Sequence, residues 1–153
     1  MQSTATDPFY AKLQNPVLQA VVVLAAVFVI NIGTIFARTA GMEIEQRFPW
    51  TITAAFVLFF SVGNALISIL ASDTEKYWSR SILSFVGLAV LAGLMAYLFS
   101  SMGINEAGSY RWIYIVLTIG YLVFLSIIGF MKKIVEFAQR EEWNQPRIRR
   151  RKK

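Results

Sequence analysis

The fold is decided by residues 112–131, which read WIYIVLTIGYLVFLSIIGFM and contain no charged side chain. At 1.5 Å per residue, an α-helix of this length spans about 30 Å, the thickness of the hydrocarbon core of a bilayer. Apolar side chains lie on every face of such a helix, so an amphipathic helix of a soluble protein does not fit the pattern. The stretch therefore predicts a transmembrane helix.

Three other stretches, residues 17–37, 50–71 and 82–102, are equally long and also free of Asp, Glu, Lys and Arg. Apolar residues make up 56% of the chain, against about 45–50% in soluble domains. We therefore expect an all-α integral membrane protein, a compact left-handed four-helix transmembrane bundle with short loops. We do not expect the first stretch to be a cleaved signal peptide, because its apolar run is too long.

The basic residues predict the orientation of the four spans. Nine of the fifteen Lys and Arg residues follow residue 131. With the N-terminus inside, twelve would lie on the inner side and three, Arg38, Arg47 and Arg111, on the outer side. Positively charged flanks stay in the cytoplasm, so both termini are predicted to be cytoplasmic, in a plasma or inner membrane.

The two ends of the chain form separate predicted regions around the transmembrane domain of residues 17–131. Residues 1–16 are expected to be a cytoplasmic, interfacial segment, and residues 132–153 a helical extension followed by a polybasic tail. Pro146 ends the helical pattern, and six of the seven residues after it are basic. Such a run attracts anionic headgroups by roughly 1 kcal/mol per charge. The alternative is that the tail only fixes topology. The predicted lipid- or partner-binding residues are Lys132, Lys133, Arg147, Arg149, Arg150, Arg151, Lys152 and Lys153.

Small and polar residues form stripes within the first three spans. Small residues let helices approach closely, and polar side chains at membrane depth form bonds between helices. These residues are therefore expected to form packing seams, with the alternative that Asn31 and Asn64 line a polar path or ligand site. They are Asn31 and Thr34 in the first span, Ser61, Asn64, Ala65 and Ser68 in the second, and Ala89, Gly93 and Ala96 in the third.

Aromatic residues lie near the ends of the predicted spans. Trp50, Trp78 and Trp112 each stand at or just before the start of a span, as expected of side chains at a membrane interface. Tyr97, Tyr114 and Tyr121 are expected at an interface for the same reason, with a bound quinone or lipid headgroup as the alternative.

Several classes of chemistry are excluded or disfavoured by composition. The chain has no Cys and no His, which removes thiolate nucleophiles, the commonest metal and haem ligands and the usual general base. All carboxylates lie outside the four spans, so no ionisable group is available at membrane depth for proton coupling. We expect no enzymatic activity, no catalytic residues, no cofactor and no metal.

The predicted function is that of a non-enzymatic accessory or scaffolding subunit of a membrane complex. Expected partners are membrane lipids with anionic headgroups at the tail, and membrane proteins or further copies of the chain. Nucleic acid is not expected, because no aromatic residue follows Trp143 in the basic run. The alternative is a small oligomeric channel or transporter, with Ser61, Asn64 and Ser68 facing a shared pore.

Overall fold

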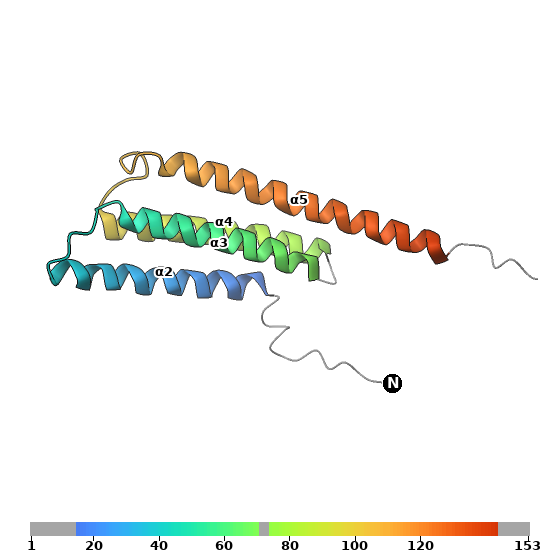
Figure 1. The fold of residues 1–153 in the computed structure, drawn as a ribbon, viewed down its shortest axis with the longest axis horizontal. Coiled ribbons are helices and arrows are strands. Elements are labelled where there is room, and N and C mark those ends of the chain that lie inside the picture. The colour runs from blue at the N-terminus through green and yellow to red at the C-terminus, as the bar shows by residue number, and fades with distance from the viewer. Residues whose placement is uncertain (1–14, 71–73, 144–153) are drawn as a thin grey trace, which may run out of the picture.

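The computed structural model describes residues 15–70 and 74–143 (Figure 1). They form four helices and no β-strand: α2 (Pro16–Thr39), α3 (Phe48–Leu70), α4 (Thr74–Ser100) and α5 (Tyr110–Trp143). All four are long and apolar enough to cross a membrane. The predicted all-helical architecture with four candidate spans is therefore confirmed. The N-terminal segment, apart from its last two residues, and the basic run after Pro146 lie outside the described residues.

Local sequence explains where α2 begins and ends. The side chain of Asn15 accepts a hydrogen bond from the backbone N–H of Val17, and Pro16 occupies the first turn, where no donor is needed. At the other end Gly41 has a φ of 90°, and the N–H of Met42 donates to the carbonyl of Ala37. This is a Schellman ending, which glycine permits because it has no Cβ.

Helix α3 lies at the centre of the bundle and packs against each of the other three helices. α2 and α4 also pack together, α4 and α5 touch over a short stretch only, and α2 and α5 do not pack against each other within the described residues. Aromatic rings form part of the core: Phe85 stacks on Tyr121 with ring centroids 4.4 Å apart and on Phe60 at 6.5 Å. Because the core is narrow, most large apolar side chains on the outer faces of the helices remain exposed.

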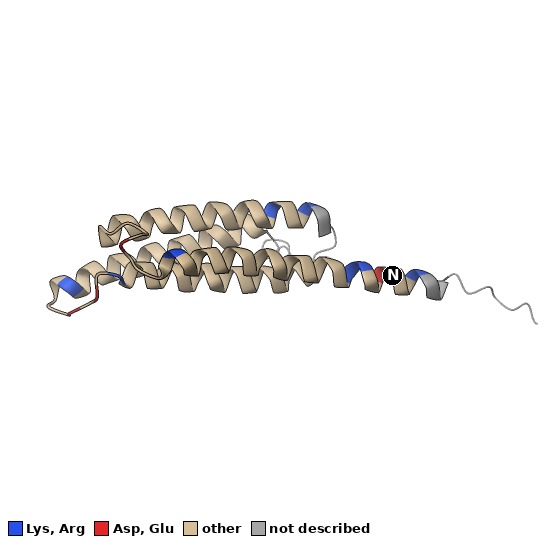
Figure 2. Cartoon of the chain, turned by 90° about the horizontal axis from the view of Figure 1, so that it is seen from above, with Lys and Arg blue, Asp and Glu red and all other residues tan. Residues whose placement is uncertain are grey.

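The bundle has two chemically distinct ends. At one end, here called the loop end, lie the α2–α3 and α4–α5 connections; at the other, the tail end, α2 and α4 begin and α3 stops (Figure 1). The charged residues gather at these two ends and leave the middle of the bundle uncharged (Figure 2). Helix α5 runs past the other helices at the tail end, and it remains helical as far as Trp143.

The loop end is closed by side chains that reach across it. Trp50 Nε1 donates to the carbonyl of Met102 at 3.2 Å, and Gln46 Nε2 donates to the carbonyl of Ser100 at 3.0 Å. Trp50 also meets Tyr114 edge-on, with ring centroids 6.1 Å apart. Trp50 is therefore buried in the bundle near the start of α3, whereas Trp112 near the start of α5 is exposed. The expected position of both at a membrane interface stays a prediction.

Candidate functional site

One buried amide contacts side chains from all three other helices. Asn64 of α3 uses its two N–H groups to donate to Gln19 Oε1 of α2 at 3.0 Å and to the Tyr77 hydroxyl of α4 at 3.1 Å. The Tyr121 hydroxyl of α5 donates to Asn64 Oδ1 at 2.8 Å. These four residues are here called the Asn64 node.

The Asn64 node lies in a nearly water-free position. The side chains of Asn64, Tyr77 and Tyr121 are buried, and Gln19 is partly buried. An amide has two donors and one acceptor oxygen, so all three groups of Asn64 are used. An unpaired polar group that is buried in this way costs free energy. The Asn64 node therefore favours the helix arrangement in which all of its hydrogen bonds form.

The rest of the predicted stripe on α3 faces inward as well. Ser61 and Ser68 are buried, and their hydroxyls donate to carbonyls of their own helix, those of Leu58 and Ala65. Ala65 is 3% exposed and belongs to the main apolar core. The whole stripe therefore points into the interior of the bundle.

A lysine at the tail end joins α5 to the end of α3. Lys132 Nζ donates to the carbonyl of Ser68, in the last turn of α3. The last carbonyls of a helix have no partner within it and carry partial negative charge, so a cation there is favourable. This contact sets the height of Lys132 relative to the end of the bundle.

The polar pair on α2 is buried but does not belong to the Asn64 node. Asn31 is 1% exposed, and its amide donates to the carbonyl of Val27 in the same helix at 2.9 Å. Thr34 donates in the same way to Ile30. Among the described residues, Asn31 Oδ1 has no hydrogen-bond partner. Among the described residues no hydrogen bond joins Asn31 to Asn64, and the alternative of a polar path lined by both stays a prediction.

The small residues of α4 divide into two groups. Ala96 is fully buried and packs in a second core cluster with Trp50 and Ala107. Ala89 and Gly93 are only half-buried. A Cβ added at Gly93 would meet no atom of another described helix within 4 Å, so none of the four helices requires a glycine there.

The three partners of Asn64 were not predicted from the sequence. Gln19 and Tyr77 were not recognised, and Tyr121 was expected in another position. Gln19 lies inside the first predicted span, yet it is absent from the predicted seams. Tyr77 is not among the predicted site residues either. Tyr121 is expected at an interface but lies in the core, 2% exposed and bonded to Asn64. The sequence holds no signal that pairs these three residues with Asn64, because their depths match only once the helices are placed beside one another.

The described residues contain no group of three or more His, Cys, Asp or Glu side chains that could hold a metal ion. Comparison of the chain with protein-family models, with curated proteins and with solved structures found no match. The fold and the node define a helical protein with four helices long and apolar enough to cross a membrane.

Proposed function

We propose that this chain spans a membrane four times and serves as a non-enzymatic accessory or scaffolding subunit of a membrane complex. The observation that supports this function most strongly is the Asn64 node. Its polar groups, which in a transporter would be free to meet a solute, are bonded to one another across the four helices. They support assembly of the bundle, and the exposed apolar surface remains for lipid and partner helices.

The competing channel function requires the polar stripe to face a pore shared between copies of the chain. Ser61, Asn64 and Ser68 are 6%, 1% and 4% exposed. A shared pore would need them on the outer surface of each copy, whereas here they lie against the chain's own helices. Their burial therefore favours the scaffolding function over an oligomeric pore.

The proposed function predicts a stoichiometric partner in the native membrane. Particles extracted with a lipid-retaining polymer are expected to contain another polypeptide, or a second copy of the chain, at a fixed ratio. Native mass spectrometry measures that ratio. Gly93→Leu is the test variant, because Gly93 is half-buried in the α4 stripe and the Cβ of a new side chain meets no atom of another helix within 4 Å. We expect the bundle to fold and the partner mass to be lost.

Gly87→Leu is the matched control, because Gly87 is exposed on another face of α4 and is equally open. It should retain the partner. A particle holding one copy and no other polypeptide would contradict the subunit function. Solute flux through liposomes containing the purified chain, abolished by Asn64→Ala, would instead establish the channel.

A further inference from the structure

We propose that the segment of α5 beyond the bundle, residues 130–140, is an interfacial helix that binds the lipids of an anionic leaflet. This inference rests on the proposed membrane function and goes beyond the basic run after Pro146, which lies outside the described residues. The proposal rests on two observations. The segment has an apolar face and a mostly basic face, and both lie close to the tail end of the bundle along its long axis.

Apolar side chains cover one arc of this segment. Phe130, Ile134 and Phe137 follow each other at i, i+4 and i+7, and Met131, Val135 and Ala138 form the adjacent row. Residues at these spacings share one face of a helix. Phe137 is 65% exposed and Ile134 is 52% exposed. No described helix covers this arc, because α5 extends past the others (Figures 1 and 2). We call it the apolar arc.

Polar and mostly basic side chains cover the rest of the segment. Lys132, Glu136 and Arg140 follow each other at i, i+4 and i+8, and Lys133 lies beside them. Lys133 and Arg140, seven residues apart, border one edge of the apolar arc. Because Lys132 is bonded to the carbonyl of Ser68, Lys133 and Arg140 are the cations that complement a surface of phosphates, and an apolar arc with a basic edge is typical of helices that bind anionic membrane surfaces.

The height of the apolar arc places it at the membrane surface. The contact between Lys132 and the carbonyl of Ser68 puts Lys132 level with the last turn of α3. At about 1.5 Å per residue, Phe137 lies roughly 7.5 Å further along the helix. The headgroup layer on each side of a bilayer is about 5–7 Å thick. With the edge of the hydrocarbon core taken at the last turn of α3, Ile134 lies within this layer and Phe137 at its outer edge.

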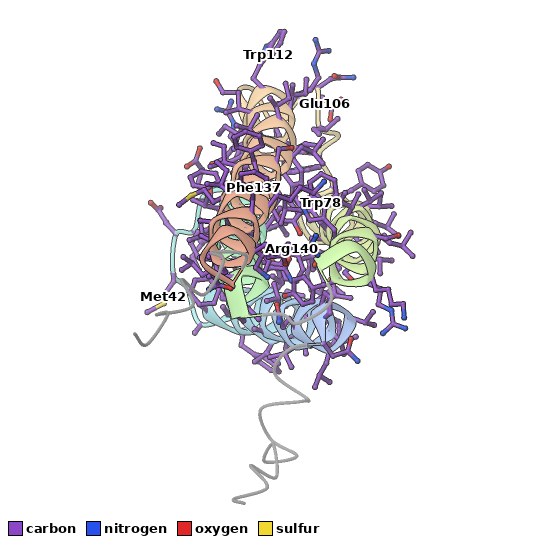
Figure 3. The ribbon with its side chains drawn as sticks, turned by 90° about the vertical axis from the view of Figure 1, so that its right-hand side faces the viewer. Met42, Trp78, Glu106, Trp112, Phe137 and Arg140 are labelled. Carbon is purple, nitrogen blue, oxygen red and sulfur yellow. The ribbon has the colours of Figure 1, made fainter. Side chains whose placement is uncertain are left out.

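The direction of the side chains on α5 brings the apolar arc closer to the acyl chains. Side chains tilt toward the N-terminus of their own helix, and in α5 that direction leads back into the bundle. The ring of Phe137 is therefore directed toward the acyl chains. The guanidinium of Arg140 is directed toward the phosphates. In Figure 3, which looks onto the tail end, both residues belong to the part of α5 nearest the viewer.

Spin labels on single cysteines test this proposal, and the natural chain has no cysteine to interfere. The variants Ile134→Cys and Phe137→Cys place the label on the apolar arc, and Glu136→Cys places it on the polar row. Each is reconstituted in nanodiscs of phosphatidylcholine and phosphatidylglycerol in equal parts. Contact with oxygen, which concentrates in lipid, is compared with contact with a water-soluble nickel chelate.

We expect the oxygen-to-nickel ratio at residues 134 and 137 to exceed that at residue 136 several-fold. In a chain ending at Trp143 the difference should persist, because the apolar arc and not the basic run produces it. Replacing Lys133 and Arg140 by glutamine, or using phosphatidylcholine alone, should reduce it.

Equal ratios at residues 136 and 137 would overturn the proposal, since the segment would then stand in water. Low contact with both reagents at residues 134 and 137 would overturn it too, because a protein partner or a second copy would cover the arc. Val123 is half-exposed in the middle of α5. A label there distinguishes failure of the interfacial-helix proposal from failure of the proposed membrane-spanning function. Oxygen contact at Val123→Cys shows that the bundle is in lipid even if the arc is not.

Discussion

Asn64→Ala is expected to lower the free energy of unfolding by about 2 kcal/mol more than Asn31→Ala does. The two asparagines are equally buried, at 1% exposure each, so the cavities left by the two substitutions are similar. They differ in their hydrogen bonds. Asn64 has side-chain bonds to three other helices, whereas the one bond found for Asn31 among residues 15–70 and 74–143 lies within α2. A bond between helices contributes roughly 0.6 kcal/mol on average, and up to about 2.

The comparison is made by reversible unfolding in mixed micelles of mild detergent and increasing dodecyl sulfate. Asn31→Ala also removes an acceptor without a partner, Asn31 Oδ1, which further reduces its cost. If both variants lose the same stability, the Asn64 node does not hold the helices together, and its assignment as the central packing element is wrong.

Ala65→Leu is expected to destabilise the bundle by about 1–3 kcal/mol, because a larger side chain must displace well-packed neighbours. Ala65 is 3% exposed and lies in the core with Phe60, Phe85 and Tyr121. Ala55→Leu is the matched control: it makes the same change in the same helix at an exposed position. Thermal unfolding in detergent should shift to lower temperature for residue 65 only. Similar shifts for both would show that this face of α3 is not packed against the other helices.

The number and approximate limits of the helices could be predicted from sequence because a membrane-crossing helix has a simple signature. A run of about 20 apolar residues without charge matches the thickness of a bilayer, whereas a buried helix of a soluble domain needs a shorter run. The stripe at Ser61, Asn64 and Ser68 was also recognisable, because spacings of i, i+3 and i+7 place residues on one face. Its direction relative to the bundle was not predictable, since an inward seam and a pore lining have the same pattern.

The partners of Asn64 required three-dimensional information. Gln19 and Tyr77 lie close to the start of their helices, where polar and aromatic residues are common because they face the membrane surface. Gln19 and Tyr77 reach the depth of Asn64 only through the relative positions of the helices along the bundle axis. Gly93 differs from these residues. Its spacing with Ala89 and Ala96 predicts a close helix approach, but no described atom of another helix lies within 4 Å of a Cβ added there.

We propose that the four helices cross a membrane and leave the two chain ends on the same side. Labelling of single cysteines with a membrane-impermeant maleimide tests it most directly, because the natural chain contributes no background. Glu45 and Glu106 are exposed at the loop end, and Lys76 is exposed at the tail end. Intact cells should label Glu45→Cys and Glu106→Cys, and only inverted membrane vesicles should label Lys76→Cys and Arg149→Cys. Labelling of residues 45 and 149 from the same side of the membrane would contradict the four-span topology.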